Sequence, residues 1–548
     1  MPKIADFERS MLGRIIAPLT ALAEDWSYAP GDMPDRRKFL IFGVMAFGQF
    51  MALFDIQIVS ASLRDVQAGL SAGPDEVSWV QTAYLMAELV MIPFSAFLAR
   101  AMSTRWLFVA SAGLFTFSSL LCGLSWNIGS MIAFRALQGF TGGAMVPLVF
   151  AVGYTLFSGK QRAMIPAILG TVGVLAPALG PTVGGLITQL LDWHWLFFVN
   201  IVPGVMVAGF SAVLLKVDHA SPAMFARIDW AHLVAMVLFL AGLEYVLEEG
   251  PRHDWFGDPT IAIGGWLSLV GFALFIERAL FSSAPIVSLR PFRRPTFAFA
   301  CLFNLVIGFG LYSSVYLVPV YLGEVRGYDS LQIGTTVFVV GVAQLGSVMI
   351  SAPLSQRIDP RWMITVGLTL FAASLWMSSY LTSDWGFWEL ALPQSLRGLA
   401  LMLCIVPSVT LALTGVPPAE LGLASGLFNL MRNLGGAIGI AVVNTWLQDD
   451  TRIAAARFGE ALGRDGGGVA SARITALAGQ LAAATPDPAT AALIAKGLFA
   501  QIVAREATTL AFNDVFRVMS WTFLAALVLV PFCRQPAGAA PPPEAAGH

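Results

Sequence analysis

Apolar and polar residues follow one another along this chain in long blocks. After a polar segment 1–38 come fourteen apolar runs of about 19 to 28 residues, the length at which a helix crosses a bilayer. The runs occupy 39–62, 77–98, 106–125, 128–150, 163–190, 197–215, 230–249, 261–281, 297–322, 332–355, 362–382, 387–413, 421–447 and 515–533. We therefore predict an all-α polytopic membrane protein with 14 transmembrane helices.

Composition supports this prediction and excludes several classes of protein. Hydrophobic residues make up 57% of the 548 residues and charged residues only 12%, about half the share of a soluble domain. The four cysteines stand singly in or beside apolar runs, so we expect neither a disulfide framework nor a metal site. Phosphate-loop and nucleophile-elbow motifs are absent from the sequence, which predicts no enzyme and no cofactor. Energy for any transport must come from an ion gradient or from the substrate.

The positive charges in short loops predict the orientation. Sixteen Lys and Arg residues fall in loops on the side of both termini, and only Arg64, Arg252 and Arg326 fall in short loops on the other side. Lys and Arg accumulate on the cytoplasmic side of bacterial membrane proteins. The predicted arrangement is therefore multi-pass, with both termini cytoplasmic.

A weak internal repeat predicts two lobes. Pro93-Phe-Ser-Ala ends the second run and precedes Arg105-Trp106, while Pro353-Leu-Ser-Gln ends the tenth and precedes Arg361-Trp362. Paired lobes with a site at their interface are typical of transporters. The predicted division is a cytoplasmic tail 1–38, a six-helix lobe 39–215, two inserted helices with linkers 216–296, a second six-helix lobe 297–533 and a cytoplasmic tail 534–548. Within the second lobe, 448–514 is predicted to be periplasmic, as a hairpin or as loose helices.

The fifth run carries a stretch of small residues and prolines. Its predicted functional positions are Gly173, Pro177, Gly180, Pro181, Gly184 and Gly185. A helix face without bulk lets a neighbouring backbone approach closely, and each proline removes a backbone donor, which predicts a kink. A general helix-packing face is the alternative interpretation of the glycines alone.

These motifs together resemble a known family. The small-residue stretch is similar to the antiporter motif of the major facilitator superfamily. Span 1 carries Phe54-Asp55, span 4 carries Arg135-Ala-Leu-Gln138-Gly139, and Trp193 to Gly204 resembles the WxWxFxxNxPxG pattern of the fourteen-span EmrB/QacA branch. The resemblance implies the major facilitator fold, a location in a bacterial inner (cell) membrane and proton-driven export of drugs. It also implies a possible periplasmic adaptor that passes cargo to an outer-membrane channel.

One motif departs from the family pattern. The inner loop after span 2, usually GxLxDRxGRR, reads Ala96-Phe-Leu-Ala-Arg100-Ala-Met-Ser103-Thr-Arg105. Arg100 replaces the acidic residue and Ser103 replaces a glycine. We therefore do not assign the usual charge-relay lock to this loop.

Charged residues inside the runs are the candidate functional residues, because each costs about 2.5–3.5 kcal/mol to insert and usually marks function. We assign proton coupling to Asp55, Arg135 and Glu88. Candidate substrate-binding residues are Glu88, Gln57, Gln138, Met86, Asn429, Arg432 and Arg397. Glu244 belongs to the inserted pair and is expected to have a structural or interfacial role. For all of these, ion pairs or hydrogen bonds that only join helices are the alternative.

The sequence thus predicts a proton-driven secondary active exporter (antiporter) of hydrophobic or amphipathic compounds such as drugs. An exporter dedicated to an endogenous lipid or metabolite would share the mechanism. A membrane-embedded lipid-modifying enzyme would need a cluster of catalytic residues at one interface, and no such motif is visible.

Overall fold

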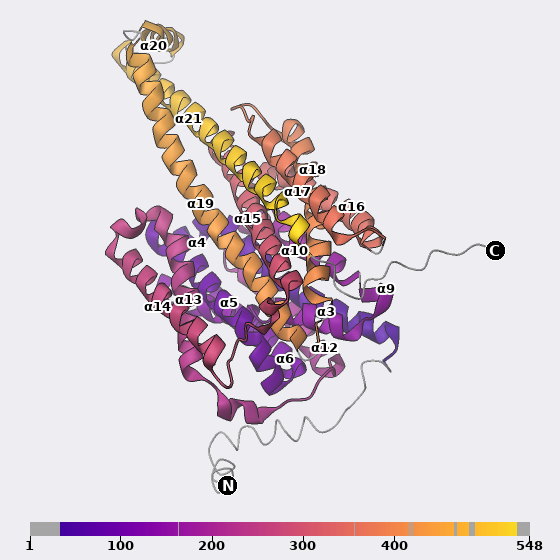
Figure 1. Ribbon diagram of the computed structural model, residues 1–548. Coiled ribbons are helices and arrows are strands. Elements are labelled where there is room, and N and C mark those ends of the chain that lie inside the picture. Colours follow the sequence, from indigo (N-terminus) through magenta and orange to yellow (C-terminus); the bar gives the residue numbers. More distant parts are fainter. Residues whose placement is uncertain are drawn as a thin grey trace, which may run out of the picture.

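The computed structural model describes residues 33–162, 164–355, 357–414, 416–417, 420–464, 468–481 and 488–533, and within these ranges it is helical without strands (Figure 1). Residues 1–32 of the predicted tail 1–38, and the whole predicted tail 534–548, lie outside the described residues. The first lobe comprises α3 (Asp35–Ala61), α4 (Leu63–Gly69), α5 (Pro74–Met102), α6 (Thr104–Gly123), α7 (Ile128–Gly142), α8 (Met145–Leu156), α9 (Gly159–Arg162), α10 (Met164–Leu190), α11 (Trp195–Phe198) and α12 (Ile201–Leu214).

The remaining helices form the inserted pair and the second lobe. The inserted pair is α13 (Trp230–Glu249) and α14 (Pro259–Phe281). The second lobe comprises α15 (Pro295–Glu324), α16 (Ser330–Leu354), α17 (Pro360–Ser378), α18 (Phe387–Leu413), α19 (Leu421–Arg464), α20 (Gly468–Leu481) and α21 (Pro488–Leu527). The fold class is the predicted one: two six-helix lobes plus two inserted helices.

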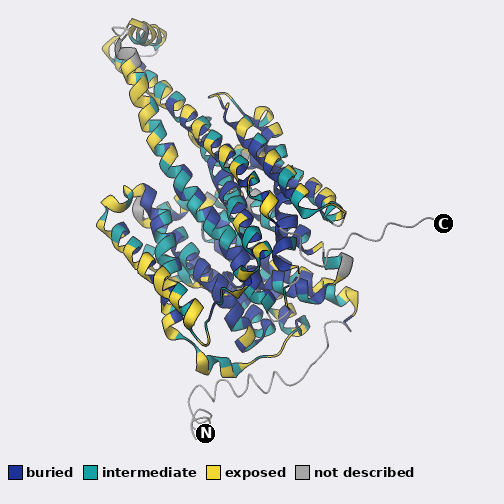
Figure 2. Cartoon of the chain, viewed as in Figure 1, coloured by how far each residue is buried: buried dark blue, intermediate teal, exposed yellow. Residues whose placement is uncertain are grey.

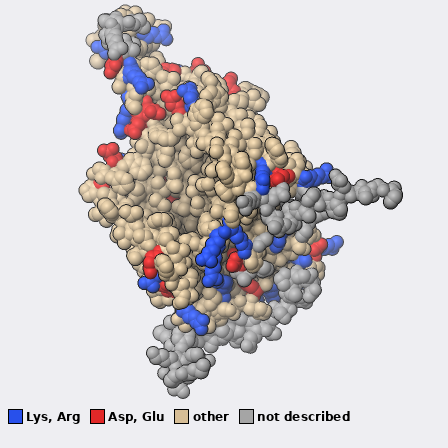
Figure 3. Space-filling model, in the orientation of Figure 1, with Lys and Arg blue, Asp and Glu red and all other residues tan. Residues whose placement is uncertain are grey.

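Each predicted span coincides with a helix or helix pair. Among the described residues, twelve helices are long and apolar enough to cross a membrane, and the two further spans coincide with α10 and α17. Span 4 is divided into α7 and α8 at Gly143–Ala144. On the face drawn in Figure 3, charged side chains gather toward the two ends of the molecule and leave an uncharged belt between them, as lipid contact requires.

Glycines set the closest helix contacts, and several belong to the motifs predicted above. A Cβ at Gly139 would lie 2.1 Å from the carbonyl oxygen of Tyr84, and one at Gly143 would lie 2.7 Å from that of Glu88, so α7 packs directly on the backbone of α5. This part of span 4 therefore serves the close packing of α7 on α5.

Helix α10 lies between the lobes. A Cβ at Gly180 would lie 2.3 Å from the Cβ of Gln57 in α3, and one at Gly184 would lie 2.8 Å from the Ile58 carbonyl oxygen. On the other lobe, Thr182 meets Gly334 of α16, and Gly170 meets Met402 of α18. The small-residue helix thus contacts span 1 and both α16 and α18.

The inserted pair contacts both lobes through α13 and the turn that follows it. Trp79 of α5 stacks on Tyr245 with ring centroids 5.4 Å apart, and the Thr82 hydroxyl donates to Glu249 Oε1 at 2.9 Å. After α13, the Trp255 indole donates to Thr445 Oγ1 of α19 at 3.1 Å. Because α13 is anchored to α5 and its turn to α19, the pair is part of the wall between the lobes.

Within its described residues, the segment 448–514 is a helical hairpin, the first of the two predicted alternatives. Helix α19 continues from the lobe to Arg464, and α21 returns from Pro488, with α20 at the tip (Figure 1). Their 44 and 40 residues correspond to lengths of about 66 and 60 Å at 1.5 Å per residue. Burial is concentrated in the lobes, and exposed residues become frequent toward the tip (Figure 2).

The departing inner loop forms a sharp junction between α5 and α6. Ser103 has φ +76°, a region that favours glycine. Its hydroxyl accepts from the Trp106 amide at 3.4 Å, and Asp218, from the segment after α12, accepts from the Thr104 amide at 2.9 Å. An acidic side chain therefore reaches this junction from another part of the chain.

Candidate functional site

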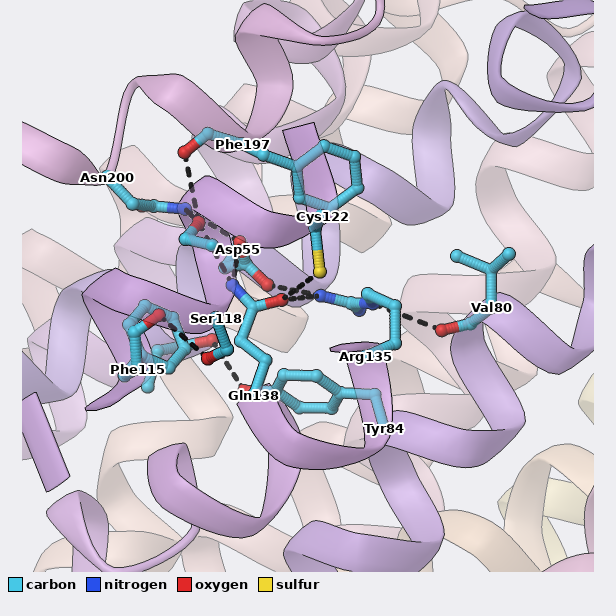
Figure 4. Close-up of polar contacts among 12 residues, drawn as sticks. Asp55, Val80, Tyr84, Phe115, Ser118, Cys122, Arg135, Gln138, Phe197 and Asn200 are labelled. Carbon is cyan, nitrogen blue, oxygen red and sulfur yellow. Dashed lines mark hydrogen bonds and ion pairs between the residues drawn. The ribbon is translucent and has the colours of Figure 1, made fainter. Parts of the chain in front are cut away.

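A buried ion pair occupies the interior of the first lobe (Figure 4). Asp55 of α3 and Arg135 of α7 are both 0% exposed, and Arg135 Nη1 lies 2.6 Å from Asp55 Oδ2. Pairing in a low-dielectric interior is strong, and removal of one partner leaves the other as an uncompensated charge. The structure thus brings together two of the three residues assigned to proton coupling.

Two amides complete the surroundings of the Asp55 carboxylate. Gln138 Nε2 donates to Oδ1 at 3.0 Å, and Asn200 Nδ2 donates to the same oxygen at 2.7 Å. Both amides also donate to the Ser119 hydroxyl at 3.1 Å, which in turn donates to the carbonyl oxygen of Phe197. Four elements, α3, α6, α7 and the turn at Asn200, therefore converge on one carboxylate.

Arg135 is held by more than its ion pair. Its Nε donates to the Val80 carbonyl oxygen at 3.1 Å, and its Nη1 also donates to Gln138 Oε1 at 2.8 Å. The guanidinium carbon lies 4.3 Å from the ring centroid of Tyr84, a cation–π contact. Its Nη2 has no hydrogen-bond partner within the part of the chain that the structure describes. A planar group is needed to satisfy these directions together.

The local sequence explains how the pair forms. Gly139 and Gly143 lie one and two turns after Arg135, so α7 can approach α5 closely enough for Arg135 to reach the Val80 carbonyl oxygen. Gly180 and Gly184 similarly bring α10 against α3, where Gly180 meets Gln57 and Gly184 meets Ile58. The small residues position the charged ones.

A separate cavity lies between the lobes. Of the predicted residues, Gln57, Glu88, Gly173 and Arg432 line it. Its other polar residues are Gln81, Glu244, Glu248, Tyr312 and Asn433, and its apolar wall includes Leu53, Ile56, Leu85, Leu89 and Leu311. An apolar cavity with a few polar groups is the usual form of a small-molecule site.

Other predicted residues lie apart from the cavity wall. Gln138 belongs to the Asp55 network, and Met86 is partly buried outside the wall. Asn429 accepts from Arg432 Nη2 at 2.8 Å and so orients that side chain. Arg397 is buried in α18, where it donates to Gln394 Oε1 at 2.6 Å and to the carbonyl oxygen of Ser314 at 3.3 Å.

The antiporter-like positions divide by role. Gly173 faces the cavity, whereas Gly180 and Gly184 pack against α3. Pro181 and Gly185 are partly buried on the same helix, and the side chain of Pro177 lies outside the described residues.

Sequence reasoning missed several members of the two sites. Asn200 and Ser119 were not singled out, although Asn200 stands in the quoted Trp193–Gly204 motif and is a polar residue within an apolar run. Glu248 was not singled out either, and it lines the cavity together with Glu244, for which a structural or interfacial role is predicted. The i, i+4 spacing of two carboxylates in one span was the available signal.

Comparison with known proteins identifies the fold and its relatives. The model of the Major Facilitator Superfamily matches residues 45–440. The solved structure of the human organic anion transporter MFSD10 (TETRAN) is similar with a TM-score of 0.55 at 14% identity, covering 91% of this chain and 100% of that one, which supports the fold.

Similar sequences include bacterial resistance and export proteins. The colistin resistance protein EmrB of Acinetobacter baumannii is 41% identical over 418 residues, 76% of this chain and 81% of that protein. The multidrug export protein EmrB of Escherichia coli (strain K12) is 27% identical over 497 residues, 90% and 95% of the two chains. The fatty acid resistance protein FarB of Neisseria gonorrhoeae is 28% identical over 412 residues, 75% of this chain and 81% of FarB.

Proposed function

Since this chain belongs to the major facilitator superfamily, within its EmrB-type branch, we propose that it exports hydrophobic or amphipathic compounds such as drugs in exchange for protons. The observation that carries the proposal is the Asp55–Arg135 pair, sealed at 0% exposure beside a cavity between two lobes. The cavity takes the compound, and the pair takes the proton.

The network around Asp55 gives protonation a mechanical consequence. In the structure all of its contacts donate to the carboxylate: Arg135, Gln138 and Asn200. A proton on Asp55 removes the negative charge that holds Arg135 and converts one acceptor oxygen into a donor. The α3–α7 contact is therefore weakened by protonation and restored by release of the proton.

Exchange follows if the two protonation states favour different lobe arrangements. Protons bind when the site opens outward and leave when it opens inward, and cargo moves the opposite way. Each proton moved down the membrane potential supplies about 2.3 kcal/mol per 100 mV. In this proposal the protein is a transporter and not an enzyme, and the proton gradient replaces any cofactor.

We place the chain in a bacterial inner membrane on the basis of its relatives, and both termini in the cytoplasm on the basis of its loop charges. The hairpin of α19, α20 and α21 then projects into the periplasm. Its length and exposed residues suit a docking surface for a periplasmic adaptor, which would pass cargo to an outer-membrane channel.

The test is transport by purified protein in proteoliposomes with an imposed pH gradient. Asp55→Asn keeps the size of the side chain and removes its titration, so we expect proton-driven efflux to be abolished. Because the variant leaves Arg135 as an uncompensated charge, the monodispersity of the purified protein is measured to show that it is folded. Asp65→Asn, at an exposed position of α4, serves as the matched control and should export normally. Export against a gradient with normal pH dependence in Asp55→Asn would contradict the proposal.

A further inference from the structure

Helix α13, from the inserted pair, supplies one wall of the cavity between the lobes. Glu244 and Glu248 of α13 line that cavity together with Glu88 of α5 and Arg432 of α19. Residues four apart on a helix lie about 5–6 Å apart at their Cβ atoms, so the two α13 carboxyls form one continuous acidic strip. Three helices from three parts of the chain therefore contribute charge to the same space.

Glu244 is buried without a full set of partners. Glu244 is only 4% exposed, and its Oε2 atom has no hydrogen-bond partner among the described residues. A buried polar atom left unpaired costs about 1–3 kcal/mol, more when it is charged. Such an atom on a cavity wall points to a group that occupies the cavity.

The charges around the cavity leave an excess of carboxyls. Glu244 lies close enough to interact with the charges of Glu248 and Glu88, and Glu88 interacts with that of Arg432. Arg432 donates a hydrogen bond through its Nη2 to Asn429 Oδ1. Its Nε has no hydrogen-bond partner among the described residues. Near the end of α13, Arg252 lies 3.8 Å from Glu249, which is outside the cavity wall, and its charge also reaches Glu248. Within the wall, three carboxyls face one guanidinium.

We infer that α13 is part of the substrate site, and that Glu244 and Glu248, with Glu88, receive the positive group of an amphipathic organic cation. The apolar wall of Leu53, Ile56, Leu85 and Leu311 receives its hydrophobic body. Two carboxyls one turn apart also favour a compound with two positive groups over one with a single charge. This inference rests on the proposed export function and narrows its substrate class.

A first experiment uses the wild-type protein and a pair of probes with the same shape and opposite charge. Purified protein in a neutral detergent is titrated with tetraphenylphosphonium and with tetraphenylborate, and binding is measured by calorimetry. We expect the cation to bind at least about tenfold more tightly, because the three carboxyls attract a cation and repel an anion of the same shape. Equal affinity for both ions, or preference for the anion, would overturn the inference without reference to any variant.

A second experiment assigns the selectivity to α13. Glu244→Gln, Glu248→Gln and the double variant are compared with Glu249→Gln, the matched control on the same helix. Glu249 bonds Thr82 outside the cavity, and a glutamine oxygen can accept the same hydrogen bond. The double variant should lose about tenfold in affinity for the dication dequalinium, less for tetraphenylphosphonium, and nothing for the neutral dye Nile red.

The outcomes separate the inference from the function on which it rests. If the double variant binds both cations as the wild type does, α13 is not part of the site, even where proton-driven efflux of Nile red persists. If cation binding depends on Glu244 and Glu248 but no probe is transported under a proton gradient, the export proposal fails and the cation site stands. Unchanged Nile red binding shows that a variant is folded. Loss of Nile red binding together with both cations would assign Glu244 and Glu248 to folding and would contradict the inference.

Discussion

Arg135 satisfies contacts in several directions with one planar group. It pairs with Asp55, donates to the Val80 carbonyl oxygen and lies over the ring of Tyr84. A lysine ammonium carries the same charge but lacks the plane and the fixed fork of donors. The geometry of the guanidinium, in addition to its charge, therefore determines how firmly Asp55 is held.

The substitution Arg135→Lys tests that role. We expect folded protein whose proton-driven efflux falls by about tenfold, the equivalent of roughly 1.4 kcal/mol, with a displaced pH optimum. The pH profile of efflux in proteoliposomes measures both effects. Arg517→Lys, at a partly exposed position paired with Asp514, is the control. An unchanged pH profile would show that Arg135 acts only as a positive charge.

Sequence alone could identify the charged members of the site but not the neutral ones. Asp55 and Arg135 are conspicuous because a charge within a span is costly. Asn200 and Ser119 are not, since single amides and hydroxyls occur often in spans and usually bond their own helix. Only the folded structure shows that Asn200 donates both to Asp55 Oδ1 and to the Ser119 hydroxyl.

At the scale of elements, α10 and α3 are joined by a contact that leaves no room for a side chain. Gly180→Val would place atoms within 2.3 Å of the Gln57 Cβ, so the helices must separate. We expect a loss of about 1–3 kcal/mol in stability and a marked fall in transport.

The control is on the same helix. A Cβ at Gly173 would meet nothing within 4 Å, so Gly173→Ala should leave the apparent melting temperature unchanged. If Gly180→Val were as stable as Gly173→Ala, the close α10–α3 contact would not exist in the membrane.

Asp229 caps the start of α13, and the stabilisation that its charge provides depends on pH. Burial opposes ionisation, but donation from Ser282 Oγ at 2.7 Å and from the His232 amide, with Arg278 nearby, brings the pKa of Asp229 below its ordinary value. A lowered folded-state pKa stabilises the protein above the unfolded value, about 3.9, and this stabilisation is lost as pH falls through the lowered pKa.

Since asparagine can still cap the helix and only the charge is lost, Asp229→Asn should cost about 0.3–1 kcal/mol at pH 7 and progressively less below pH 4. Unfolding of the detergent-solubilised protein at a series of pH values measures the difference, with Asp65→Asn as the reference. A difference that grew on acidification would have the wrong sign for this capping contact.

Sequence patterns predicted the helices more completely than their roles. All fourteen runs coincide with helices, because a bilayer demands both length and hydrophobicity. The place of α13 could not be predicted, since an inserted helix carries no signal of which neighbour it meets. Glu244 was thus expected to be structural or interfacial, and it lines the cavity.

At the scale of the whole molecule, the docking role proposed for the hairpin can be tested separately from transport across one membrane. Replacement of 455–505 by a short Gly-Ser linker removes most of the projecting part and leaves the lobes intact. We expect unchanged efflux from proteoliposomes and loss of drug resistance in whole cells, because an adaptor would have no docking surface. Growth at graded drug concentrations measures the second effect, and full resistance in cells would contradict the docking role.

The continuity of α19 has a mechanical consequence. One uninterrupted helix carries Arg432, Asn433, Gly436 and Ala437 at the cavity and ends at Arg464 near the hairpin tip. From Gly436 to Arg464 the distance is about 42 Å, so a tilt of about 10° at the cavity displaces the far end by about 7 Å. The helix therefore acts as a lever whose long arm lies outside the lobes. A probe at its far end, paired with a second probe on the first lobe, would register each rearrangement of the cavity as a change in their separation.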